Sequence, residues 1–166
     1  MSLEELRAYS REPDEGEKIW LLGGLYTFKA MGGENRNAYT LVEVKGREGL
    51  AAPMHLHENE EEGFYVVDGR VTFFLDGKEV DAAQGSWAFV PRGVKHSFRV
   101  DSSTATLLLL ISPGAAGHEG LFREMGEPAG SHTIPEPPAD PPDPSMLAEI
   151  ATRHGTSIVG PPPAAK

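Results

Sequence analysis

Between residues 19 and 111 the chain repeats one pattern, in which a short apolar or alternating segment is followed by a turn signal about every ten residues. Segment 38–44 alternates between apolar and polar faces, and segment 104–111 is apolar on both faces, which places it centrally in a sheet. Asp76-Gly77 supplies the positive φ angles of a tight hairpin turn. Many short strands of this kind predict an all-β sandwich or barrel.

The composition changes on both sides of this β-rich region. We divide the chain into an N-terminal extension (1–17), a β domain (18–112) and a C-terminal extension (113–166), and we expect short helices near the N- and C-termini. The C-terminal extension contains a proline-rich connector, then a short helix and a possible edge strand. We expect segment 134–163 to pack back on the β domain, because its apolar residues would otherwise be exposed.

Charge and composition exclude several classes of function. The 166 residues include 15 basic and 25 acidic side chains, and a net charge of −10 argues against binding to nucleic acid or to an anionic membrane. The absence of cysteine excludes disulfides and a zinc site built on sulfur. The N-terminus lacks the pattern of a signal peptide, and the aliphatic run 107–111 is too short to span a bilayer. We expect a soluble, cytoplasmic protein.

Two closely spaced histidines point to a metal site. Residues two apart in a strand point to the same face, so His55 and His57 present two imidazoles side by side. Glu62 follows and shares a strand face with Phe64 and Val66. A free carboxylate among core residues is costly unless it is paired or coordinates a cation.

A further histidine has the same kind of setting. His96 begins a predicted strand and shares its face with Phe98 and Val100, so it is the best candidate for another ligand. We expect the remaining glutamates of the acidic run to form a solvated turn and the histidines of the C-terminal extension to lie at the surface. These residues are Glu58, Glu60, Glu61, His118, His132 and His154.

His55, His57, Glu62 and His96 belong to two motifs that resemble those of the cupin superfamily. G49-x5-H55-x-H57-x4-E62-x6-G69 is similar to the first motif, and G85-x5-P91-x-G93-x2-H96 is similar to the second. The family often has asparagine where Val100 stands, at a position that is not a ligand. The resemblance implies a double-stranded β-helix, the cupin jelly-roll barrel, usually as a homodimer. It also implies one divalent metal held by His55, His57, Glu62 and His96.

Three imidazoles and a carboxylate suit a first-row metal such as Fe, Mn, Co, Ni, Cu or Zn, and leave coordination positions open. We expect an apolar substrate pocket around this metal, formed by the residues that share strand faces with the ligands: Phe64, Val66, Phe98 and Val100. The pattern leaves open whether other large apolar residues face the interior or the opposite surface. These are Phe73, Trp87, Phe89 and Leu109.

A narrower resemblance is carried by "EGFYVVDGRVTFFLDGK", "GSWAFVPRGVKHSFRV" and "GTSIVGPPP", which are similar to segments of small quercetinase-like cupins. It implies a metal-dependent dioxygenase that opens the central ring of a flavonol-like substrate and releases carbon monoxide. Its partners would be a small molecule and dioxygen, and Glu62 would act as general base. Two alternatives remain: an oxygen-independent isomerase, cyclase or decarboxylase that uses the same metal, and a small-molecule-binding cupin without catalysis.

Overall fold

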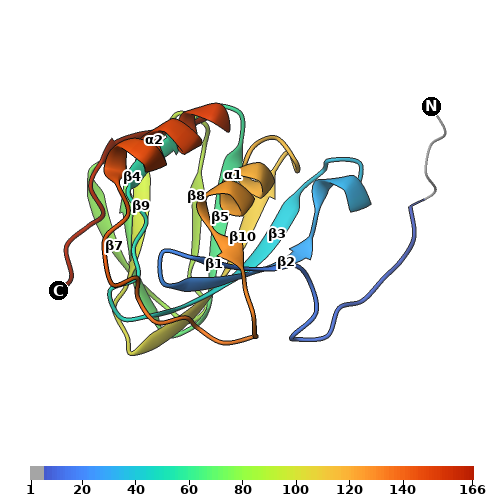
Figure 1. Cartoon of the computed structure of the whole chain (residues 1–166), viewed down its shortest axis with the longest axis horizontal. Coiled ribbons are helices and arrows are strands. Elements are labelled where there is room, and N and C mark those ends of the chain that lie inside the picture. Colours follow the sequence, from blue (N-terminus) through green and yellow to red (C-terminus); the bar gives the residue numbers. More distant parts are fainter. Residues whose placement is uncertain (1–5) are drawn as a thin grey trace.

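A computed structural model describes residues 6–166 of the chain, in which two antiparallel sheets face each other as a barrel (Figure 1). The larger sheet has seven strands in the order β11-β1-β2-β3-β10-β5-β8. Its strands are β1 (Lys18–Leu21), β2 (Gly24–Ala30), β3 (Thr40–Arg47), β5 (Glu61–Asp68), β8 (Trp87–Val90), β10 (Thr104–Ser112) and β11 (Glu127–Pro128). The all-β barrel expected from the sequence is confirmed.

The smaller sheet has five strands in the order β12-β4-β9-β6-β7. Its strands are β4 (Met54–His57), β6 (Arg70–Leu75), β7 (Lys78–Ala83), β9 (His96–Val100) and β12 (Thr156–Gly160). Within residues 6–166, three short helices complete the fold: the 3-10 helix η1 (Gly32–Glu34), α1 (His118–Met125) and α2 (Pro144–Arg153). Helices α1 and α2 contact each other beside the barrel (Figure 1).

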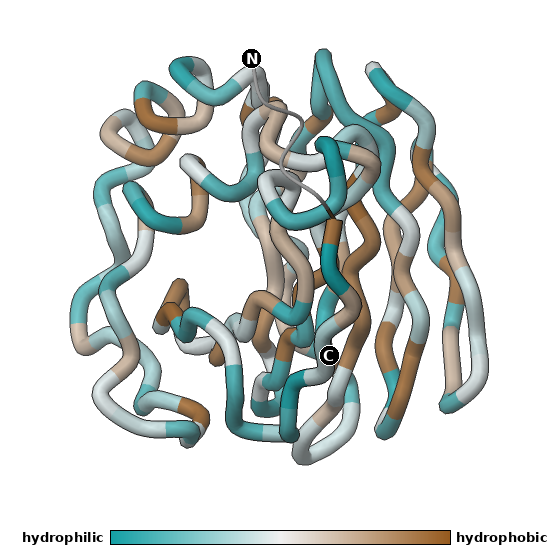
Figure 2. The backbone as a smooth tube through the Cα atoms, turned by 90° about the vertical axis from the view of Figure 1, so that its right-hand side faces the viewer, coloured by the Kyte–Doolittle hydropathy of each residue, from teal (hydrophilic) through white to brown (hydrophobic). Residues whose placement is uncertain are grey.

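The core lies between the sheets and follows from the alternation of the strands. Hydrophobic residues alternate with hydrophilic ones along many strands, whereas the loops are mostly hydrophilic (Figure 2). The rings of Phe64 and Phe73 pack across the interior, with centroids 5.3 Å apart. Burying a side chain of this size stabilises the fold by roughly 1.5–3 kcal/mol, so these inward-facing residues hold the two sheets together.

The turn at Asp76-Gly77 joins β6 to β7 as the sequence predicts. Both residues have positive φ, 48° and 81°, as the two central positions of a type I′ turn require. Strand β10 lies between β3 and β5, which confirms its central place in the sheet. Its outer side is nevertheless partly open, because Leu110 remains 37% exposed.

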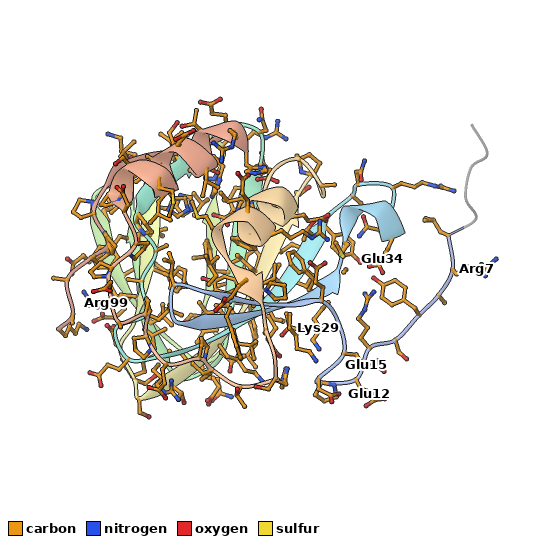
Figure 3. The ribbon with its side chains drawn as sticks, in the orientation of Figure 1. Arg7, Glu12, Glu15, Lys29, Glu34 and Arg99 are labelled. Carbon is orange, nitrogen blue, oxygen red and sulfur yellow. The ribbon has the colours of Figure 1, made fainter. Side chains whose placement is uncertain are left out.

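The helix expected near the N-terminus, from the spacing of Leu3, Leu6 and Tyr9, is not present in residues 6–17. Leu3 lies outside the described residues. Instead, this segment is tied to the barrel by polar contacts. Arg11 pairs with Glu34, and the Lys29 ammonium donates to three carbonyls of residues 12–15. Lys29, Glu12 and Glu15 lie near one another in Figure 3. These contacts stabilise an extended conformation of the segment, and its proline and glycine disfavour a helix.

The C-terminal extension packs back on the barrel, as expected. Helix α2 begins after Asp143, whose side chain accepts a hydrogen bond from the Ser145 N–H at 2.9 Å, and it ends before Gly155, which has a φ of 74°. Strand β12 then pairs antiparallel with β4. This pairing covers the edge of the strand that carries His55 and His57.

Candidate metal centre

The four predicted ligands converge between the two sheets. His55 and His57 lie on β4, His96 begins β9 directly opposite His55, and Glu62 reaches in from β5 of the other sheet. One ligand atom from each residue lies within 4.8 Å of those of the other three. His57, Glu62 and His96 are buried, and His55 is half-buried. The structure therefore brings together every residue of the predicted ligand set.

Each imidazole is oriented through its Nδ1 atom. The Nδ1–H groups of His55 and His96 donate to the carbonyls of Pro53 and Val94, at 2.6 and 2.9 Å. Nδ1 of His57 bonds the hydroxyl of Thr156 at 2.8 Å. A nitrogen that donates to a carbonyl carries the ring proton, so the Nε2 atoms of His55 and His96 present lone pairs to the centre. Metal-binding histidines are commonly held in this way.

These lone pairs meet a carboxylate oxygen and call for a cation between them. Glu62 Oε2 lies 2.5 Å from Nε2 of His96 and 3.1 Å from Nε2 of His57. Among the described residues, His57 Nε2 has no hydrogen-bond partner although it is buried. Both Nε2 of His96 and Oε2 of Glu62 are acceptors, and at 2.5 Å they repel each other unless a proton or a metal lies between them. The donor set thus fits a divalent first-row metal.

Electrostatics favour the ligand forms of these groups. Burial, with help from His96 and His57, lowers the pKa of His55 to about 3, and burial also lowers the pKa of His57. Burial would raise the pKa of Glu62, but the neighbouring His57 and His118 outweigh it and hold that pKa well below its ordinary value. Neutral imidazoles and an ionised carboxylate are the forms that bind metals.

His118 corrects the expectation of a surface histidine. It is 2% exposed and lies at the first turn of α1, where Nε2 is 2.7 Å from Glu62 Oε1 and Nδ1 is 2.5 Å from Glu60 Oε2. Glu60 is also buried, so its assignment to a solvated turn was wrong. Burial alone would lower the pKa of His118, but the charges of both glutamates and the hydrogen bonds to them raise it to about 10.

The other residues of the expected surface group belong to neither group that could hold a metal. Glu58 is exposed and Glu61 is half-buried; His132 is half-buried near Lys45, and His154 pairs with Glu124 at 2.6 Å. A helical signal distinguishes His118 from these. His118, Leu121, Phe122 and Met125 share one face of α1 by the spacing of three and four residues, and this face is turned to the barrel.

Two neighbouring cavities extend from His55 to the C-terminal extension. The inner one, about 70 Å³, is lined by His55, Tyr26, Phe122 and Thr156 among others. The outer one, about 570 Å³, we call the tail chamber; its wall combines residues 49–53 of the barrel with prolines of the C-terminal extension. Leu22, Ala51, Pro53 and Ile158 line both cavities, so the two lie side by side between the C-terminal extension and His55. Tyr26 is not among the site residues predicted from the sequence. Burial, and then the charge of Glu62, raise the pKa of its hydroxyl.

The residues predicted to line the substrate pocket are Phe64, Val66, Phe98 and Val100, and the structure places all four in the buried core. The ring centroid of Phe64 lies 6.1 Å from that of His96. Their role toward a substrate stays a prediction. The residues whose direction the sequence left open are now placed: Phe73 and Leu109 are buried, whereas Trp87 and Phe89 are exposed on the outer face.

The comparison with known families agrees with this fold and site. Residues 41–112 match the family model Cupin_2, described as a cupin domain, and this region contains all four predicted ligands. The chain therefore contains a cupin domain. Within that family its sequence is similar to quercetin 2,3-dioxygenases, which makes it a quercetinase-like cupin.

Two of these relatives define the extent of the similarity. Quercetin 2,3-dioxygenase of Bacillus subtilis is 30% identical over 132 residues, covering 79% of this chain and 39% of the relative. Quercetin 2,3-dioxygenase of Aspergillus japonicus is 28% identical over 116 residues, covering 66% and 33%. The chain thus spans well under half the length of either enzyme.

A solved structure shows that the same fold also serves other chemistry. Pac13 of Streptomyces, a nucleoside dehydratase, is 17% identical with a TM-score of 0.56, over 77% of this chain and 96% of that structure. At this identity the likeness concerns the fold alone. No helix in residues 6–166 is long and apolar enough to cross a membrane.

Proposed function

We propose that this protein is a metal-dependent dioxygenase that opens a flavonol-like or related enolisable aromatic compound. The observation that carries the proposal is the cluster of four potential ligands beside a mainly apolar cavity. The similarity to two quercetin 2,3-dioxygenases supports the substrate class. We assign His55, His57, Glu62 and His96 as ligands of one divalent metal and Glu62 as the catalytic base.

Glu62 is suited to take a proton only from an acidified group. Its lowered pKa makes it a weak base at neutral pH. A bound metal would act as a Lewis acid and lower the pKa of a coordinated hydroxyl. Glu62 Oε2 lies among the imidazoles, within reach of a hydroxyl placed there, so it would accept that proton and leave an electron-rich anion for dioxygen.

The tail chamber would select and orient the substrate. Its lining is almost wholly apolar, with prolines from residues 138–144 and 161–163 opposite Leu50 and Ile158. Flat faces of this kind bind aromatic rings by exclusion of water. Phe122 and Tyr26 continue the wall inward to His55. A planar phenolic compound would thus be led with one end toward the ligands.

We also infer that the protein pairs as a homodimer through the outer face of the larger sheet. Trp87 and Phe89 on its edge strand are 56% and 53% exposed, and Tyr65 and Leu110 continue the apolar surface beside them. A contiguous exposed apolar area of this kind is typical of an interaction site. Sedimentation that shows only monomers at micromolar concentration would contradict this pairing.

Oxygen consumption tests the proposed reaction. Metal-free protein would be reconstituted separately with Fe, Mn, Co, Ni, Cu or Zn and mixed with quercetin in an oxygen-electrode cell, with carbon monoxide measured in parallel. Glu62→Gln removes the proposed base and ligand charge, and Glu61→Gln is the matched control because Glu61 lies outside the cluster. We expect metal-dependent uptake that is lost in Glu62→Gln and kept in Glu61→Gln.

Other outcomes separate the alternatives. Stoichiometric metal binding without oxygen uptake, for quercetin and a panel of related phenols, would refute the dioxygenase and favour an oxygen-independent isomerase, cyclase or decarboxylase. Ligand binding without any turnover would favour a small-molecule-binding cupin.

A further inference from the structure

His118 lies outside both cupin motifs and yet touches the proposed catalytic base. It begins α1 and is inserted between two carboxylates, with Glu62 Oε1 at 2.7 Å from one ring nitrogen and Glu60 Oε2 at 2.5 Å from the other. All three side chains are 2–3% exposed. Because carboxylates flank both nitrogens, His118 donates a hydrogen bond from each.

Glu60 fixes the place of His118 in two ways. Its Oε2 accepts the ring Nδ1–H, and its Oε1 accepts the backbone N–H of His118 at 3.0 Å. The ring is further enclosed by His57, at 4.2 Å between centroids, and by Phe122, at 5.2 Å. A side chain held by two hydrogen bonds and two rings has one orientation, so the direction of its Nε2–H is fixed.

This fixed donor determines how Glu62 is presented. Its Oε1 is occupied by His118, whereas its Oε2 points among the Nε2 atoms of His57 and His96. We propose that His118 and Glu60 form a positioning pair. The pair holds Oε1 of Glu62 in a hydrogen bond and leaves Oε2 to bind the metal and accept the substrate proton. The inference rests on the metal site proposed above.

Cobalt binding tests the positioning pair without relying on turnover. Metal-free wild type, His118→Gln, Glu60→Gln and His154→Gln would be titrated with Co²⁺ while affinity, stoichiometry and the visible spectrum are recorded. His154 is the matched control, because it is paired with Glu124 of α1, the helix that also carries His118, and belongs to neither ligand cluster. Melting temperatures of the metal-free forms show whether each variant folds.

We expect His118→Gln and Glu60→Gln to weaken Co²⁺ binding by roughly 10–100-fold, the usual effect of losing an outer-shell partner. Their visible spectra should shift, because the carboxylate ligand changes its orientation, and His154→Gln should match wild type. If His118→Gln does not fold, Glu60→Gln decides, since it keeps the ring and a side chain of the same size.

Three results would overturn the inference. The first is wild-type affinity and spectrum in both variants. The second is two Co²⁺ ions per chain, which would make Glu60 and His118 ligands of a second metal beside His57. The third is a wild type that binds no Co²⁺, which would refute the metal site itself. Cobalt binding by wild type without oxygen uptake would refute only the proposed reaction and leave the positioning pair standing.

Discussion

Two buried threonines predict opposite responses to the same substitution. Thr156 on β12 is 4% exposed and bonds Nδ1 of His57 at 2.8 Å. Thr27 on β2 is 0% exposed, and its hydroxyl has no hydrogen-bond partner among residues 6–166. Valine has nearly the shape of threonine and suits a strand, so each substitution removes a hydroxyl with little change in packing.

The magnitudes follow from what each hydroxyl leaves behind. Thr156→Val leaves a buried ring nitrogen of His57 without its hydrogen-bond partner, which lowers the free energy of unfolding by about 1–3 kcal/mol. For a domain of this size that lowers the melting temperature by about 2–12 °C. Freed from its partner, His57 is also less well oriented, so Co²⁺ affinity should fall roughly 10–100-fold. Thr27→Val removes an unpaired hydroxyl and should leave the melting temperature unchanged or higher.

Calorimetry of the metal-free proteins and cobalt titration of the same samples make the comparison. Equal melting temperatures for Thr156→Val and Thr27→Val would refute the view that the hydroxyl of Thr156 supports His57. A lower stability of Thr156→Val with unchanged metal affinity would limit that hydrogen bond to a structural role.

Two further predictions address the tail chamber and the N-terminal segment. Ile158→Phe narrows the tail chamber and should raise the KM for quercetin several-fold with unchanged metal stoichiometry. The neighbouring Val159 is exposed, so Val159→Phe should leave KM unchanged. Equal KM values for the two variants would contradict a role of the tail chamber in substrate binding. The hydrogen bond from Arg11 is the main cause that lowers the pKa of Glu34 below its ordinary 4.5, so the pair stabilises the fold above that pH and the contribution is lost as pH falls through the lowered pKa. Denaturation of Glu34→Gln between pH 7 and about 3 should therefore show a deficit against wild type that shrinks on acidification; a deficit independent of pH would contradict the ion pair.

The barrel and the ligand set were accessible from sequence because their signals are local. Strand alternation, the Asp76-Gly77 turn and the spacing of His55, His57 and Glu62 each depend on neighbours a few residues apart. His96 comes from the other motif, yet its place at the start of a strand identified it. The structure brings these elements together as predicted.

The second carboxylate–histidine contact was missed because its partners are distant in sequence. Glu60 and His118 are 58 positions apart, and each sits in a stretch that resembles exposed loop. A run of glutamates is usually solvated, and a glycine-rich segment usually turns at the surface. The one local signal is the apolar face of α1: His118 lies on this face one turn before Leu121, which indicates a buried side chain.

The pairing of β12 with β4 also has a consequence for the order of folding. Thr156 is 99 positions from His57, whereas the hairpin from β6 to β7 closes over two residues. Long loops close late, because their entropy is lost before their contacts form. Until β12 arrives, β4 is an open sheet edge, and His57 lacks the hydroxyl that orients it. We therefore expect the proposed metal pocket to form late in folding, so that a chain that bound metal through its histidines earlier would do so before the tail chamber exists.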